Sequence, residues 1–107
     1  MDIEDYAAWA AALSGVSPGG CSDRERLSYL GLGLAGEAGE VADHVKKLLR
    51  DGDTAWRPEQ VADELGDVAY YWAALCVAVG RSPAEVLAAS HAKITAKVAA
   101  ARRLPET

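Results

Sequence analysis

The chain has 107 residues, a formal net charge of −5 and a hydrophobic fraction of 50%, which suits one domain over residues 1–107. The acidic balance argues against a protein that grips a nucleic-acid polymer, which needs a basic surface, but a metal ion can supply local positive charge for a nucleotide. No apolar run approaches the roughly 20 residues of a membrane span, and the N-terminus does not resemble a secretory signal, so we expect a cytoplasmic protein.

The first half of the chain predicts two helices. Alanine is abundant and phenylalanine is absent, which favours helix over sheet. The first helix is expected over residues 3–13, followed by a loop rich in glycine and proline over residues 14–20. The second helix is expected over residues 23–49, with Ser22 or Asp23 as its N-cap.

The predicted second helix contains four glycines, at positions 31, 33, 36 and 39. Each glycine costs a helix interior about 1 kcal/mol relative to alanine. Such a cost is compensated where a neighbouring helix or a ligand approaches closely. We therefore expect a close approach along this helix, and a kink is compatible with the same glycines.

The second half predicts two more helices. Pro58 suits the first turn of a helix that extends to residue 79, and Gly80 is a typical C-terminal stop. Ser82, Pro83 and Glu85 form an N-terminal capping sequence for a helix that ends near residue 102. The expected fold is all-α, a four-helix bundle-like protomer. Because a chain this short buries a modest core, we also expect self-association as a homodimer or homotetramer.

One acidic phrase occurs twice in the predicted second and third helices. Residues 37–42 and 64–69 both read Glu-x-Gly-acid-Val-Ala, which places Glu37 with Glu40 and Glu64 with Asp67. Acids three residues apart project from the same side of a helix. Two such pairs on facing helices would repel each other unless a cation lay between them. Ligands that offer only oxygen favour Mg²⁺, Mn²⁺ or Ca²⁺.

The helical phase of these acids strengthens the argument. Glu37 and Glu64 fall inside the apolar stripes of their helices, whereas Glu40 and Asp67 fall at the edges. A buried unpaired carboxylate costs several kcal/mol or remains protonated. The alternative is that all four are surface charges or salt-bridge partners between helices, which two matched pairs disfavour.

These motifs resemble those of the MazG-like group of all-α nucleoside triphosphate pyrophosphohydrolases. Residues 33–43 resemble the first motif of that family, and residues 62–68 resemble the second. The resemblance covers roughly residues 25–98 and implies hydrolysis of (deoxy)nucleoside triphosphates to the monophosphate and pyrophosphate. It also implies a role in nucleotide house-cleaning or pool control.

The resemblance assigns roles to the acids. Glu37, Glu40, Glu64 and Asp67 match the Mg²⁺ ligands of the family, and Mn²⁺ is an alternative ion. A divalent cation neutralises phosphate oxygens and lowers the pKa of bound water. A carboxylate that does not bind the metal could accept the proton of the attacking water. Glu37 or Glu40 could play this part, and the sequence does not choose between them.

Three further residues are candidate substrate contacts. Lys93 matches the lysine of a family Asn-x-x-Lys segment, although Ser90 stands in place of the asparagine. Lys47 is a candidate phosphate contact, with a solvated lysine near a helix end as the alternative. Trp56 is the preferred residue to stack on a base. The other aromatic candidates, Tyr6, Trp9, Tyr29, Tyr70, Tyr71 and Trp72, are expected in the core or at an interface.

Other functions find less support. Cys21 and Cys76 lie in no redox or metal spacing and are expected to be free thiols. The glycines at 31, 33 and 36 match a dinucleotide-binding spacing, but they lie within a predicted helix that follows no strand. No Glu-x-x-His pair supports a di-iron site. The remaining alternative is a non-catalytic helical module that dimerises or regulates a partner.

Overall fold

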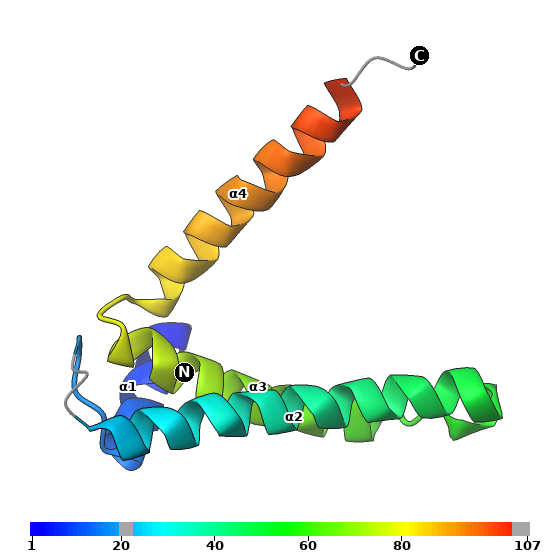
Figure 1. The fold of residues 1–107 in the computed structure, drawn as a ribbon, viewed down its shortest axis with the longest axis horizontal. Coiled ribbons are helices and arrows are strands. Elements are labelled where there is room, and N and C mark those ends of the chain that lie inside the picture. Colours follow the sequence, from blue (N-terminus) through cyan, green and yellow to red (C-terminus); the bar gives the residue numbers. More distant parts are fainter. Residues whose placement is uncertain (20–22, 104–107) are drawn as a thin grey trace.

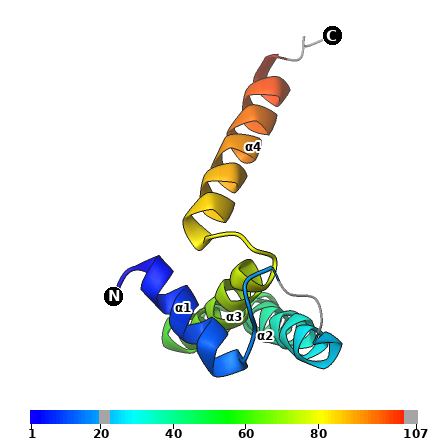
Figure 2. The same cartoon turned by 90° about the vertical axis from the view of Figure 1, so that its left-hand side faces the viewer.

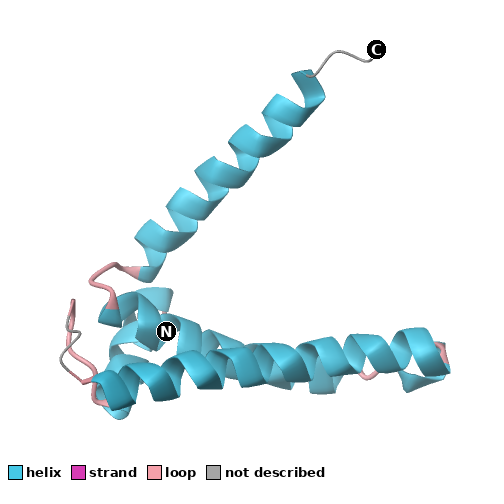
Figure 3. Ribbon diagram, viewed as in Figure 1, coloured by secondary structure: helices cyan, strands magenta, loops and turns pink. Residues whose placement is uncertain are grey.

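The computed structural model describes residues 1–19 and 23–103, and this part of the chain is helical without a strand (Figure 3). The elements are α1 (Ile3–Ser14), α2 (Arg24–Asp51), the 3₁₀ helix η1 (Asp53–Ala55), α3 (Pro58–Ala78) and α4 (Pro83–Arg103). The prediction of an all-α fold with four helices is therefore confirmed. The predictions for Cys21 and Ser22 concern residues outside the described part.

The helix ends confirm the local signals in the sequence. The Asp23 side chain accepts a hydrogen bond from the backbone N–H of Arg26 at 3.0 Å, and so caps α2. Pro58 occupies the first turn of α3. Gly80, with φ of 75°, follows α3, and the Ser82 hydroxyl accepts from the Glu85 N–H at 3.1 Å. α2 runs without interruption from Arg24 to Asp51.

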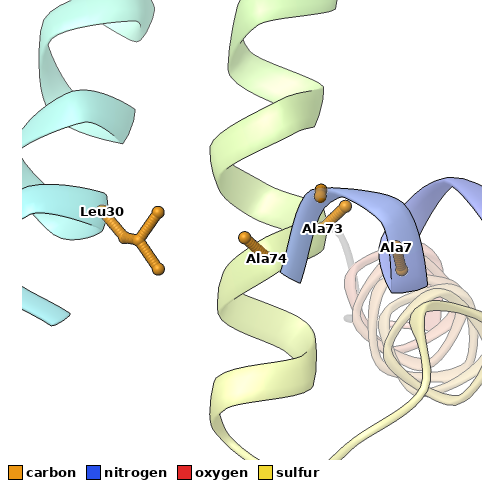
Figure 4. Packing of buried hydrophobic residues seen from close by; sticks show 5 residues of the cluster. Ala7, Leu30, Ala73 and Ala74 are labelled. Carbon is orange, nitrogen blue, oxygen red and sulfur yellow. The ribbon is translucent and has the colours of Figure 1, made fainter. Parts of the chain in front are cut away.

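α2 and α3 form a long antiparallel hairpin, and α1 packs on α3 near the open end of that hairpin (Figures 1 and 2). Figure 4 shows Leu30 of α2 pointing toward Ala74 of α3, with Ala7 of α1 beyond α3. Ala10 and Ala73 complete this buried cluster. Alanine side chains are short, so they let three helix backbones approach closely around one leucine.

Gly33 sets the fit between α2 and α3. A Cβ atom at Gly33 would overlap the Tyr71 ring, so only glycine leaves room for that ring. The predicted close approach of a neighbouring helix is confirmed at this position. At Gly31, Gly36 and Gly39 a Cβ would meet no atom within 4 Å in the described part of the protomer. These three glycines are therefore not required by packing within one described protomer.

α4 projects away from the other helices (Figures 1 and 2). α3 and α4 are bent relative to each other by 100°, and near their junction the Glu4 carboxylate accepts a hydrogen bond from the Ala84 N–H at 3.0 Å. The radius of gyration is 17.3 Å, above the roughly 13 Å of a compact chain of this length. Leu87, Ile94 and Val98 are exposed along α4. One protomer therefore leaves an apolar helix face uncovered.

Within the described residues, no single helix combines the length and apolar character needed to cross a membrane, and only the bent pair of α3 and α4 satisfies those criteria together.

Candidate metal centre

Three of the four predicted acids converge midway along the α2–α3 hairpin. One carboxylate oxygen each from Glu37, Glu64 and Asp67 can be chosen so that all lie within 4.8 Å of one another. The packing of Gly33 against Tyr71 explains this register. The two helices are antiparallel, so a step forward along α2 corresponds to a step backward along α3. Glu37 lies about one turn after Gly33 and Asp67 about one turn before Tyr71, and the two acids therefore face each other.

The electrostatics of the cluster favour a cation. The pKa of Glu37 is raised, first because its carboxyl group shares a hydrogen bond with Glu64, and then because of desolvation and the nearby charges of Asp67, Glu64 and Glu40. Glu37 and Glu64 are half-buried, and Asp67 is exposed. Like charges in such proximity resist full ionisation. A divalent cation would remove this repulsion and stabilise all three carboxylates in their charged form.

The donor set fits a hard divalent cation. It consists of carboxylate oxygens alone, the ligands that Mg²⁺, Mn²⁺ and Ca²⁺ prefer. Two oxygens on opposite sides of an Mg²⁺ ion lie about 4.2 Å apart, because each Mg–O distance is about 2.1 Å. The 4.8 Å limit of the cluster is therefore close to coordination distances.

Glu40 differs from the other predicted ligands. It is exposed on α2, one turn after Glu37, and is not part of the group of converging oxygens. Its charge still contributes to the raised pKa of Glu37, so it lies beside the cluster. The sequence predicted all four acids as metal ligands, with Glu40 at the edge of its apolar stripe, whereas the structure brings together three and leaves Glu40 adjacent to them.

His44 is a neighbour of the cluster for which the sequence favoured a simple hydrogen-bonding role, with a contact to a metal ligand or to a base as the alternatives. Its Nε2 atom lies 3.9 Å from Oε1 of Glu64, and the two side chains are only 16% and 22% exposed. This places an imidazole beside a predicted ligand. Helical spacing already indicated this position, because His44 follows Glu37 by two helical turns and shares its face of α2.

The predicted substrate contacts lie apart from the acids in this protomer. The Lys47 ammonium lies 3.0 Å from the Asp43 carboxylate, and Lys46 also contacts that group, so the pKa of Asp43 is lowered. Trp56 precedes α3 at the closed end of the hairpin. Glu64 lies further along α3, about 9 Å from Pro58 along the helix axis. Lys93 is exposed on the projecting helix α4.

Tyrosine side chains adjoin the acid cluster instead. Tyr71 hydrogen-bonds to Tyr29, and this bond, desolvation and nearby charges that include Glu37 raise the pKa of Tyr71 to about 12. Burial and then the charge of Asp67 raise the pKa of Tyr6. These tyrosines were expected to be core or interface residues, and Tyr71 does pack against the core. Tyr29 is 64% exposed.

An all-α protein with a carboxylate cluster suited to a divalent cation is the class that this fold and site define. Residues 26–101 match the model of the MazG nucleotide pyrophosphohydrolase domain. The chain therefore belongs to the MazG family, which confirms the resemblance seen in the sequence. It is also 48% identical over 80 residues to the "Gene 37 protein" of Mycobacterium phage L5, an alignment that covers 70% of this chain and 69% of that protein. No solved structure matches the chain.

Proposed function

We propose that this protein is a Mg²⁺-dependent pyrophosphohydrolase that converts (deoxy)nucleoside triphosphates to the monophosphate and pyrophosphate, and so serves nucleotide pool house-cleaning in the cytoplasm. The observation that carries the proposal is the convergence of Glu37, Glu64 and Asp67 within a MazG domain. An acidic cluster by itself is common on protein surfaces, but this one has the ligand chemistry and the motif positions that the reaction needs.

Each acid has a role in this proposal. Glu37, Glu64 and Asp67 would hold Mg²⁺, and Mn²⁺ would fit the same oxygen donors. The bound ion would neutralise phosphate charge and lower the pKa of a water molecule. Glu40 lies beside the cluster without joining it, which supports a role for Glu40 as the group that would accept a proton from that water. Glu37 remains the alternative base if the cation is held chiefly by α3.

The proposal includes self-association as a dimer or tetramer. Leu87, Ile94 and Val98 expose between 42% and 55% of their surface on α4, and a second copy of the chain could cover this face. Such an assembly would add basic residues to an acidic site. Lys93 and Lys47 are the proposed phosphate contacts in the assembled protein, and Lys47 would first have to leave Asp43.

A panel of canonical and damaged nucleoside triphosphates tests the activity. Each nucleotide is incubated with the protein and Mg²⁺, Mn²⁺ or a chelator, and pyrophosphate and orthophosphate are measured separately. We expect metal-dependent release of pyrophosphate. Glu64→Gln and Asp67→Asn should each abolish most turnover while circular dichroism remains helical. Release of orthophosphate as the sole primary product would contradict the proposal, because a different bond would then be cut.

A further inference from the structure

Aromatic side chains extend from the acid cluster, midway along α2, toward a separate cleft near the N-terminal end of that helix. The Tyr71 ring packs against Gly33, which precedes Glu37 by about one turn of α2. The Tyr71 ring centroid is 6.1 Å from that of Tyr29 and 5.2 Å from that of Tyr70, both in edge-on contacts. A continuous tyrosine surface therefore extends from the acids toward the N-terminal end of α2.

The cleft itself has a volume of about 470 Å³. Tyr29 and Tyr70 contribute its aromatic walls, and its other lining residues are Leu13, Ser14, Glu25 and Arg26. It therefore combines the features of a small-molecule site: a concave surface, aromatic and apolar walls, and a few polar groups. Residues from α1, α2 and α3 contribute to it, so its shape depends on the packing of the three helices.

Several hydrogen bonds hold the polar side of the cleft in place. The hydroxyl groups of Tyr70 and Ser14 lie 2.8 Å apart and share a hydrogen bond. Arg26 donates from Nη1 to the Ser14 carbonyl at 3.0 Å and from Nε to Asp23 at 2.8 Å. Gly15, with φ of 71°, leaves room for that guanidinium, because a Cβ there would overlap it. The cleft is thus formed before any ligand enters.

The separation between cleft and acids suits a nucleotide. Tyr29 precedes Glu37 by eight residues, which corresponds to about 12 Å along α2. On α3, Tyr70 and Asp67 are three residues apart and project from the same side. A nucleoside triphosphate whose phosphates lay at the acids could extend its base along the tyrosines into the cleft.

We infer that the cleft lined by Tyr29 and Tyr70 receives the base of the nucleotide, with the base stacked on the Tyr29 ring. The inference rests on the proposed function for the position of the phosphates. Tyr29 contacts Tyr71 edge-on and remains 64% exposed, so a ring face is free for stacking. Glu25 offers hydrogen-bond acceptors and Arg26 offers donors at the polar edge of the base.

Equilibrium binding tests the inference without any turnover. The four deoxynucleoside 5′-monophosphates and deoxyribose 5-phosphate, which has no base, are titrated into the protein with Mg²⁺ and followed by calorimetry. We expect the base-bearing ligands to bind at least about tenfold more tightly, because stacking contributes roughly 1–3 kcal/mol per base. Tyr29→Ala should weaken the binding of these ligands about tenfold and leave the binding of deoxyribose 5-phosphate unchanged. Tyr29→Phe should retain the affinity for all of them.

Two further variants complete the experiment. Leu32→Ala is the matched control, because Leu32 is on the same helix, is 75% exposed and does not line the cleft. Equal effects of Tyr29→Ala and Leu32→Ala would overturn the inference, as would monophosphates that bind no better than deoxyribose 5-phosphate. A loss of base-dependent affinity in Trp56→Ala but not in Tyr29→Ala would also overturn the inference, because it would show that the base binds at the closed end of the hairpin. Absence of pyrophosphate release would refute the proposed function separately.

Discussion

Substitution of Glu37 by glutamine should have opposite effects on stability with and without Mg²⁺. In a chelator, the wild-type protein holds the carboxylates of Glu37, Glu64 and Asp67 close together without a cation. The pKa of Glu37 is raised, first by its hydrogen bond with Glu64 and then by desolvation and the nearby negative charges. Glu37→Gln removes one negative charge and supplies an amide donor to Glu64. The variant should therefore melt at a temperature equal to or above that of the wild type when no metal is present.

Addition of Mg²⁺ should reverse this order. An ion that binds only the folded state stabilises it by about 2.7 kcal/mol at a concentration of 100 Kd. For a domain of this size each kcal/mol shifts Tm by about 4–8 °C, so the wild type should gain roughly 11–22 °C. The variant has lost one of three ligands and should gain much less at the same Mg²⁺ concentration.

Thermal melting by circular dichroism at a constant protein concentration measures both effects, with EDTA and with a series of Mg²⁺ concentrations. Asp53→Asn is the control, because Asp53 is an exposed acid on η1 that is not part of the cluster, and it should keep the full Mg²⁺ response. The reasoning fails if Glu37→Gln responds to Mg²⁺ as strongly as the wild type, or if it is clearly less stable than the wild type in EDTA.

Three other predictions test the site, the helix packing and the assembly. Glu40→Gln should keep most of the Mg²⁺ stabilisation but lower kcat by about 10²-fold or more, as expected for loss of a general base; loss of the Mg²⁺ response would instead identify Glu40 as a ligand. Gly33→Ala should reduce the free energy of unfolding in urea by about 1–2 kcal/mol, because overlap with Tyr71 outweighs the higher helix propensity of alanine. Gly31→Ala, where a Cβ meets open space, should raise it by up to about 1 kcal/mol. Ile94→Gln should weaken self-association in sedimentation velocity without loss of helicity, and an unchanged sedimentation coefficient would exclude this face of α4 from the interface.

The sequence by itself determined the four helices and most of their ends. Asp23, Pro58, Gly80 and Ser82 act through hydrogen bonds and dihedral angles within a few residues of each helix end, so their effect can be predicted without the fold. The predicted ends differ from the observed ones by two residues or fewer. The inward phase of Glu37 follows from helical periodicity in the same way.

The tertiary structure decided which side chains meet. Glu37, Glu64 and Asp67 converge because Gly33 admits the Tyr71 ring and so sets the register of α2 against α3. The repeated motif predicts Glu40 as a ligand together with these acids, but the packed helices leave it outside the group. Contacts between helices depend on register and crossing angle, which are properties of two surfaces together.

The direction of α4 and the position of the aromatic cleft could also not be predicted without the tertiary structure. The capping residues predicted where α4 begins, but a bend of 100° after α3 carries Lys93 away from the acids of its own protomer. The cleft beside Tyr29 arises from residues of three helices that are distant in sequence. Local hydrogen bonds determine where a helix starts and stops, whereas only the packing of side chains between helices determines which residues each face of the helix contacts.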